Sequence, residues 1–103
     1  MKVDKYVFIA YIKQTVGIDL ISEYKFHHTR RWRFDFVNLE NKLAIECDGG
    51  VWANGRHTRG SGYIGDMEKF NQAALYGFRV LKFLPNEMLK LETAELIAKC
   101  CGK

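Results

Sequence analysis

The sequence of 103 residues has a single proline and no low-complexity run. Nothing in this composition resembles that of a disordered protein. No apolar stretch approaches the ~20 residues that a membrane-spanning helix needs, so we expect no membrane partner. Hydrophobic residues, at 48%, and aromatic residues, at 14%, are plentiful instead. This content suffices for one hydrophobic core, and the length predicts a single domain over residues 1–103.

Cysteine is also scarce, and its three copies are poorly placed for disulfide bonds. Cys100 and Cys101 are adjacent, and Cys47 falls in a stretch with the pattern of a core strand. None of the cysteines has the spacing of a zinc site. We therefore expect reduced thiols, which favour a cytoplasmic protein.

Two stretches, residues 31–37 and 43–48, show the alternation of apolar and polar residues that is typical of β-strands. A two-residue turn at Glu40-Asn41 would join them as a hairpin and set Asp35 opposite Glu46. The remaining alternate positions hold a set of residues suited to a core, namely Trp32, Phe34, Phe36, Leu43, Ile45 and Cys47.

Asp48 lies two residues after Glu46 and therefore on the same predicted face of the hairpin. Three carboxylates on one patch repel one another unless a cation lies among them. Mg²⁺ takes oxygen ligands and is the expected cation, with Mn²⁺ as a substitute. The alternative is a solvated face of the sheet on which the acids pair with nearby arginines. A site is favoured because Asp35 faces another acid, and because Asp48 runs into Gly49-Gly50, where backbone can approach a ligand closely.

Positive charge is in slight excess, +4 with a pI near 9.0, but it is concentrated on both sides of the predicted acidic cluster. The candidates for contacts with phosphate are Arg30, Arg31, Arg33, Arg56 and Arg59. Basic groups around acids favour an anionic polymer, a nucleic acid, as the partner. A solvated charged face is the alternative.

The rest of the chain predicts further helices and strands. Helices are expected over residues 1–16, 66–76 and 86–99, the last interrupted near Thr93, and strands over residues 22–28 and 78–84. A helix precedes the last strand, which favours parallel pairing for that strand. The order of elements predicts an α/β three-layer sandwich around a mixed four-stranded sheet. The glycine-rich residues 51–65 predict a long functional loop.

Short motifs follow one another along the chain in the order EYKFHHTRRWRFDF, KLAIECDGG, GRHTRG and GFRVLKF. Their order resembles the PD-(D/E)XK nuclease superfamily, in a small branch near the very-short-patch repair endonucleases and the phage-type nucleases. The resemblance implies a restriction-endonuclease-like fold, magnesium-dependent hydrolysis of phosphodiester bonds in DNA, and the cytoplasm of a bacterial or phage-infected cell. The chain departs from the superfamily where Asp48 replaces the usual strand lysine, a departure that related branches with Glu-x-Asp-Gly share.

The strand pattern and the resemblance together assign roles in a magnesium-dependent endodeoxyribonuclease. Asp35 and Glu46, with the backbone carbonyl of Cys47, would hold the metal. Asp48 would be a further ligand or would orient a water molecule. The superfamily often places a catalytic lysine or glutamine on the helix after the loop, so Lys69 is the expected replacement for the missing lysine.

Two other residues have roles that remain open. His57, where the resemblance carries a histidine, would transfer a proton or contact phosphate, and the alternative is a solvent-exposed loop residue. Glu23 is a candidate fourth acid, and the alternative is a surface glutamate at the start of a strand. For Lys69 the alternative is an exposed helix lysine paired with Asp66 or Glu68.

Three rival functions share parts of this pattern. A Holliday-junction-type resolvase would have the same site but would need a homodimer to cut two strands, whereas the endonuclease could act as a monomer. A catalytically idle DNA-binding module would keep the basic residues and would not need the acids. A small domain that binds metal in order to fold would not need the basic residues.

Overall fold

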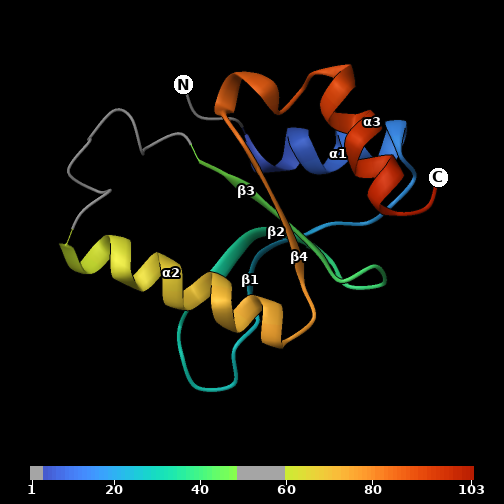
Figure 1. Cartoon of the computed structure of the whole chain (residues 1–103). Coiled ribbons are helices and arrows are strands. Elements are labelled where there is room, and N and C mark those ends of the chain that lie inside the picture. The colour runs from blue at the N-terminus through green and yellow to red at the C-terminus, as the bar shows by residue number, and fades with distance from the viewer. Residues whose placement is uncertain (1–3, 49–59) are drawn as a thin grey trace.

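The computed structural model describes residues 4–48 and 60–103. Its elements are α1 (Lys5–Thr15), β1 (Ile21–Lys25), β2 (Arg33–Asn38), β3 (Leu43–Cys47), α2 (Gly60–Leu75), β4 (Arg79–Phe83), the 3-10 turn η2 (Pro85–Glu87) and α3 (Leu91–Cys100). The strands form one sheet, with α1 and α3 on one face and α2 on the other (Figure 1). The prediction of an α/β protein with a mixed four-stranded sheet is confirmed.

Helix α1 begins where Asp4 caps it, because the Asp4 side chain accepts hydrogen bonds from the backbone N–H groups of Tyr6 and Val7. The chain leaves the helix through Gly17, whose φ of 84° is accessible to glycine at little cost. The predicted helix over residues 1–16 is confirmed for Lys5–Thr15. In the described residues, no helix combines the length and the apolar character needed to cross a membrane.

The strands lie in the order β1-β2-β3-β4. The first two pairings are antiparallel, and β3 pairs with β4 in parallel, as the intervening helix predicted. Phe36 pairs with Ile45 and Asn38 with Leu43. This register is the one that a turn at Glu40-Asn41 predicted, and one further step along it sets Asp35 across from Glu46.

The hydrophobic core has two layers, one on each face of the sheet. The larger lies between the sheet and the helices α1 and α3, and its fully buried members are Phe8, Ile12, Leu43, Ile45, Met88 and Ile97. The smaller lies between the sheet and α2, and it is built by Phe26, Phe34, Val37, Ala44, Ala73 and Phe78.

The apolar set of the predicted hairpin is divided between these layers, since Phe34 packs beneath α2 and Phe36 beneath α1. Strict alternation would place both rings on one face. Between the pairs Ser22–Phe36 and Tyr24–Phe34, Glu23 and Asp35 do not pair, and Glu23 has a φ of 51°. The pairing of β1 with β2 is therefore irregular between the two rings.

Three boundaries differ from the sequence-based expectation. Helix α2 begins at Gly60 and not at Asp66, so Asp66 is not its cap and Lys69 lies in its middle. Glycines cost about 1 kcal/mol each in a helix, but propensity is a weak prior that the fold overrides here. Strand β1 ends at Lys25, and the C-terminal helix is interrupted before Leu91 rather than near Thr93.

Candidate active site

Asp35 and Glu46 come together where the ladder between β2 and β3 stops. The backbone N–H of Asp35 donates to Oε2 of Glu46 at 2.8 Å, and the backbone N–H of Cys47 donates to Oδ2 of Asp35 at 2.7 Å. Each carboxylate thus accepts a hydrogen bond from a backbone N–H group of the neighbouring strand. The predicted approach of these two acids is present in the structure.

Lys69 supplies the cation at this place. Its Nζ lies 2.8 Å from Oε1 of Glu46, and the two side chains are only 13% and 14% exposed. The ammonium also lies 5.2 Å from the centre of the Phe34 ring and 5.4 Å from that of Phe70. Because Lys69 is paired with a residue 23 positions away, it is not the exposed helix lysine of the alternative interpretation.

Burial raises the pKa of Glu46 above its ordinary value, because the charged form loses hydration. The hydrogen bond and the charge of Lys69 act in the opposite direction, as does the N–H of Asp35, while the negative charge of Asp35 adds to the rise. We call the group formed by Asp35, Glu46 and Lys69 the acidic cluster. A second lysine is close by, because Lys82 pairs with Glu46 in the parallel ladder and its Nζ lies 3.9 Å from the centre of the Phe70 ring.

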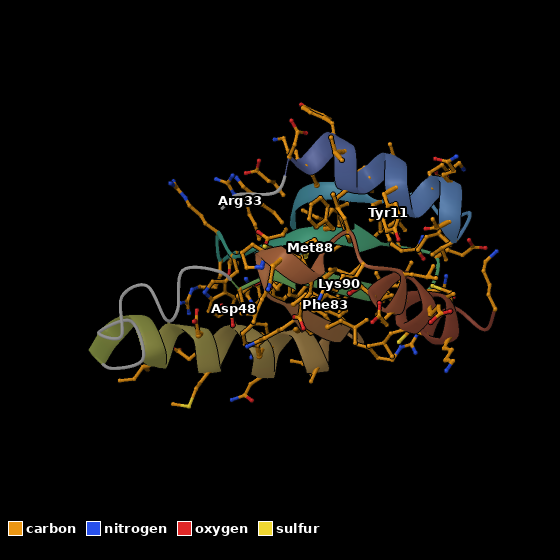
Figure 2. All side chains as sticks on the ribbon, turned by 90° about the horizontal axis from the view of Figure 1, so that it is seen from above. Tyr11, Arg33, Asp48, Phe83, Met88 and Lys90 are labelled. Carbon is orange, nitrogen blue, oxygen red and sulfur yellow. The ribbon has the colours of Figure 1, made fainter. Side chains whose placement is uncertain are left out.

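Asp48 lies just beyond β3, next to the end of β4 (Figure 2). Its backbone N–H donates to the carbonyl of Phe83 at 2.7 Å, which extends the parallel pairing by one residue. In the part of the chain that the structure describes, no three His, Cys, Asp or Glu residues form a group that could hold a metal ion. The roles of Asp48 and of the Cys47 carbonyl as ligands stay predictions.

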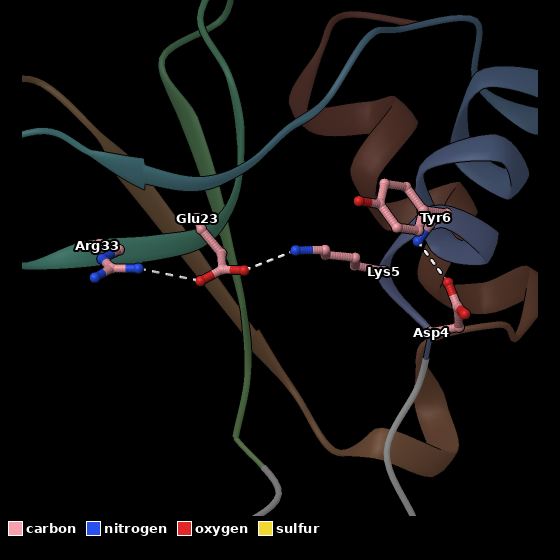
Figure 3. Close-up of polar contacts among 5 residues, drawn as sticks. All are labelled: Asp4, Lys5, Tyr6, Glu23 and Arg33. Atoms are coloured by element: carbon pink, nitrogen blue, oxygen red, sulfur yellow. Dashed lines mark hydrogen bonds and ion pairs between the residues drawn. The ribbon is translucent and has the colours of Figure 1, made fainter.

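Glu23 is held by two cations on the side of the sheet that faces α1 (Figure 3). Its carboxylate lies 2.8 Å from Nζ of Lys5 and 3.2 Å from Nη1 of Arg33. The hydrogen bond from Lys5 is the main cause that lowers the pKa of Glu23. Glu23 and Arg33, which we had predicted as a fourth acid and a phosphate contact, are therefore joined to each other in this structure.

The predicted basic residues are spread over several surroundings. The guanidinium of Arg30 lies over the Trp32 ring, 4.0 Å from its centre, and 3.9 Å from the carboxylate of Glu68. Arg31 is exposed. Arg56, His57 and Arg59 lie outside the described residues, so their predicted roles stay predictions.

A polar pocket of about 390 Å³ lies between the segment after β1 and the helix α2. Its lining residues are His27, Thr29, Arg30, Trp32, Glu68, Asn71 and Gln72. Apart from Arg30, none of them was among the predicted site residues. The spacing of Glu68, Asn71 and Gln72 at i, i+3 and i+4 places them on one face of a helix, and this was the signal available in the sequence.

Comparison with protein-family models, with curated proteins and with solved structures found no match to this chain. The resemblance described above therefore depends on the order of short motifs alone.

Proposed function

We propose that this protein is a metal-dependent DNA endonuclease that hydrolyses phosphodiester bonds, with a restriction-endonuclease-like arrangement of its sheet and helices. The observation that carries the proposal is the convergence of Asp35, Glu46 and Lys69 at the point where β2 and β3 part. Two carboxylates and a lysine from three different elements, largely shielded from water, are a costly arrangement for a purely structural purpose. Partly buried ionisable groups of this kind are candidates for function.

The donors of the acidic cluster suit Mg²⁺, which prefers carboxylate oxygens and keeps several water ligands. Asp35 and Glu46 would hold the ion, with the carbonyl of Cys47 and the carboxylate of Asp48 as further donors. The approach of the two carboxylates supports this assignment, since a divalent cation between them would offset their mutual repulsion. When bound, the ion supplies an acidified water and a counter-charge for the phosphate.

Lys69 has two tasks in this proposal. Its hydrogen bond fixes one oxygen of Glu46, while the N–H of Asp35 fixes the other, so that the carboxylate is oriented before any ligand arrives. Its positive charge lies beside the Glu46 carboxylate, and in this proposal it replaces the missing strand lysine and stabilises the charge that develops on the scissile phosphate. Proton transfer is assigned to His57 as a prediction from the resemblance.

A cleavage assay tests the proposal. Purified protein is incubated with linear, nicked and branched DNA in Mg²⁺, in Mn²⁺ and in excess chelator, together with Asp35→Asn and Glu46→Gln. We expect cleavage that the chelator and both substitutions abolish. Glu92→Gln, at an exposed position of α3, is the matched control and should cleave like the wild type.

The rival functions predict different results in the same assay. Paired cuts in branched DNA alone, by a dimeric protein, would identify a junction-resolving enzyme. DNA binding without cleavage under any condition would identify an idle binding module. Absence of metal-dependent cleavage of every substrate would overturn the proposal.

A further inference from the structure

The pocket beside α2 is distinct from the acidic cluster and has its own polar lining. One wall is the segment that links β1 to β2, with His27, Thr29, Arg30 and Trp32, and the other is a face of α2, with Glu68, Asn71 and Gln72. Its volume of about 390 Å³ is within the range of sites for small organic groups.

His27 holds the first wall in place. Its Nδ1 accepts hydrogen bonds from the backbone N–H groups of Thr29, at 3.2 Å, and Arg30, at 3.0 Å. A nitrogen that accepts in this way carries no proton, so Nε2 bears the hydrogen and donates it to Oε1 of Gln72 at 3.2 Å. The linking segment is thereby attached to α2, and the pocket has a defined shape before any ligand binds.

The pocket has a planar cationic surface. The Arg30 guanidinium lies 4.0 Å from the centre of the Trp32 ring, and that ring is stacked with Phe26 at an interplanar angle of 14°. The guanidinium is thus supported by the Trp32 ring, while about half of the Arg30 side chain is exposed. Nucleobases stack on guanidinium planes and on aromatic rings of this kind.

The wall formed by α2 offers both donors and acceptors at the edge of this surface. Because Oε1 of Gln72 accepts from His27, its amide N–H₂ group is the end that can donate to a ligand. Asn71 is exposed and supplies a second amide, which can donate and accept. The Glu68 carboxylate can accept from an exocyclic amino group, as acidic side chains do with cytosine.

We infer that this pocket binds one unpaired base of a nucleic-acid strand, stacked on Arg30 and hydrogen-bonded by Asn71 and Gln72. The inference deepens the proposed function, on which it rests for the identity of the strand. Glu68 directly precedes Lys69 in α2, and Trp32 lies three residues before Asp35, about 10 Å along an extended chain. One strand could therefore engage the pocket and the acidic cluster together.

A binding assay without cleavage tests the inference. The wild-type chain is titrated, in chelator, with a labelled single-stranded oligonucleotide and with the same length of abasic strand, which keeps the phosphates and lacks the bases. We expect the base-containing strand to bind on the order of tenfold more tightly. Arg30→Ala and Asn71→Ala should reduce this ratio severalfold, whereas equal affinity of the wild type for both strands would overturn the inference.

Two matched controls separate loss of the base contact from loss of charge or of folding. Arg31→Ala removes the same charge from the same segment without lining the pocket, so it should weaken both strands equally and leave the ratio unchanged. Asn86→Ala, at an exposed position in η2, should change neither affinity. A ratio that falls as far in Arg31→Ala as in Arg30→Ala would count against the pocket.

Further measurements distinguish a free nucleotide from a strand as the ligand, and they test the pocket separately from the proposed nuclease function. Free deoxynucleoside monophosphates are tested alongside, and binding of these with exclusion of the strand would overturn the assignment to a polymer. If the protein binds the base-containing strand more tightly than the abasic strand but cleaves no DNA, the pocket inference is supported and the proposed nuclease function is overturned. If the protein cleaves DNA but binds both strands equally, the nuclease function is supported and the pocket inference is overturned. If it binds neither strand, both proposals are overturned.

Discussion

The two faces of the sheet are made by the same strands, but they differ in what they bury. Beneath α1 and α3 the fully buried side chains are apolar, among them Phe8, Ile45 and Met88. Beneath α2 the ion pair between Glu46 and Lys69 lies beside the apolar layer, with Nζ of Lys69 5.2 Å from the centre of the Phe34 ring. The comparison indicates that one face is built for stability, while the other gives up apolar packing and regular pairing for a charged group.

The difference extends to the backbone. Around Ile45 and Phe36 the strands pair in register, whereas one residue further the carboxylates of Asp35 and Glu46 take the hydrogen bonds of the neighbouring strands. The pairing of β3 with β4 continues past this level to Cys47 and Phe83, so only the junction of β2 and β3 is interrupted by the carboxylates.

The largest effect is expected from breaking the apolar face. Phe8 is fully buried, and its ring centre lies 4.7 Å from that of Phe36. Phe8→Ala should lower the free energy of unfolding by about 3–5 kcal/mol, because it removes apolar contacts and leaves a cavity. Urea denaturation measures the loss. Val7→Ala, at an exposed neighbouring position, should stay within about 0.5 kcal/mol of the wild type, and equal losses in both would contradict the assigned core.

The next largest effect is expected from Mn²⁺, which in the proposed function binds at the charged face. Mn²⁺ at a hundredfold excess over its dissociation constant should stabilise the wild type by about 2.7 kcal/mol, seen as a higher melting temperature. Asp35→Asn and Glu46→Gln should each remove most of this gain and weaken Mn²⁺ binding in calorimetric titration. Asp48→Asn decides whether Asp48 is a ligand, since an unchanged affinity would exclude it. Binding that survives both of the first two substitutions would show that the acidic cluster is not the metal site.

Removal of the lysine should have a smaller effect that depends on pH. Burial raises the pKa of Glu46, and Lys69 opposes this rise. Lys69→Met should therefore raise the pKa of Glu46 further. When the pKa of a carboxyl group is higher in the folded than in the unfolded state, its ionisation costs more in the folded state. The free energy of unfolding therefore falls as the pH rises through the folded-state pKa. We expect a loss of about 1–3 kcal/mol near pH 8.

The loss in Lys69→Met should become smaller near pH 4, where Glu46 is protonated and needs no partner. Chemical denaturation at the two pH values measures the difference. Lys99→Met, at an exposed position of α3, should show no such dependence. An equal loss at both pH values would mean that Lys69 acts through packing and not through the charge of Glu46.

The smallest effect is expected at Glu23, where the ion pairs with Lys5 and Arg33 are open to solvent. Exposed pairs contribute little, so Glu23→Gln should leave the melting temperature unchanged in physiological salt. Since the pKa of Glu23 is lowered, any contribution is present at neutral pH and disappears on acidification. Cleavage by Glu23→Gln decides its role, because a fourth catalytic acid would be required and an ion-pair residue would not.

The sequence by itself determined the local parts of this protein. The alternation over the hairpin and the turn at Glu40-Asn41 predicted the register that sets Asp35 across from Glu46, because a period of two and a short turn leave one pairing. The pattern of α1 and the parallel last strand were predicted for the same reason, since each depends on neighbouring residues or on a single connection.

Only the tertiary structure decided how these parts meet. Lys69 reaches Glu46 from another element, the helix α2 that covers this face of the sheet, and no periodicity in the sequence encodes that distance. The separation of Phe34 from Phe36 likewise depends on which helix covers each ring. The sequence predicted the spacing of the acids, and the resemblance named Lys69 as a candidate. The contact of Lys69 with Glu46 depends on the packing of α2 against the sheet, because contacts between distant segments are fixed by the whole fold and not by local pattern.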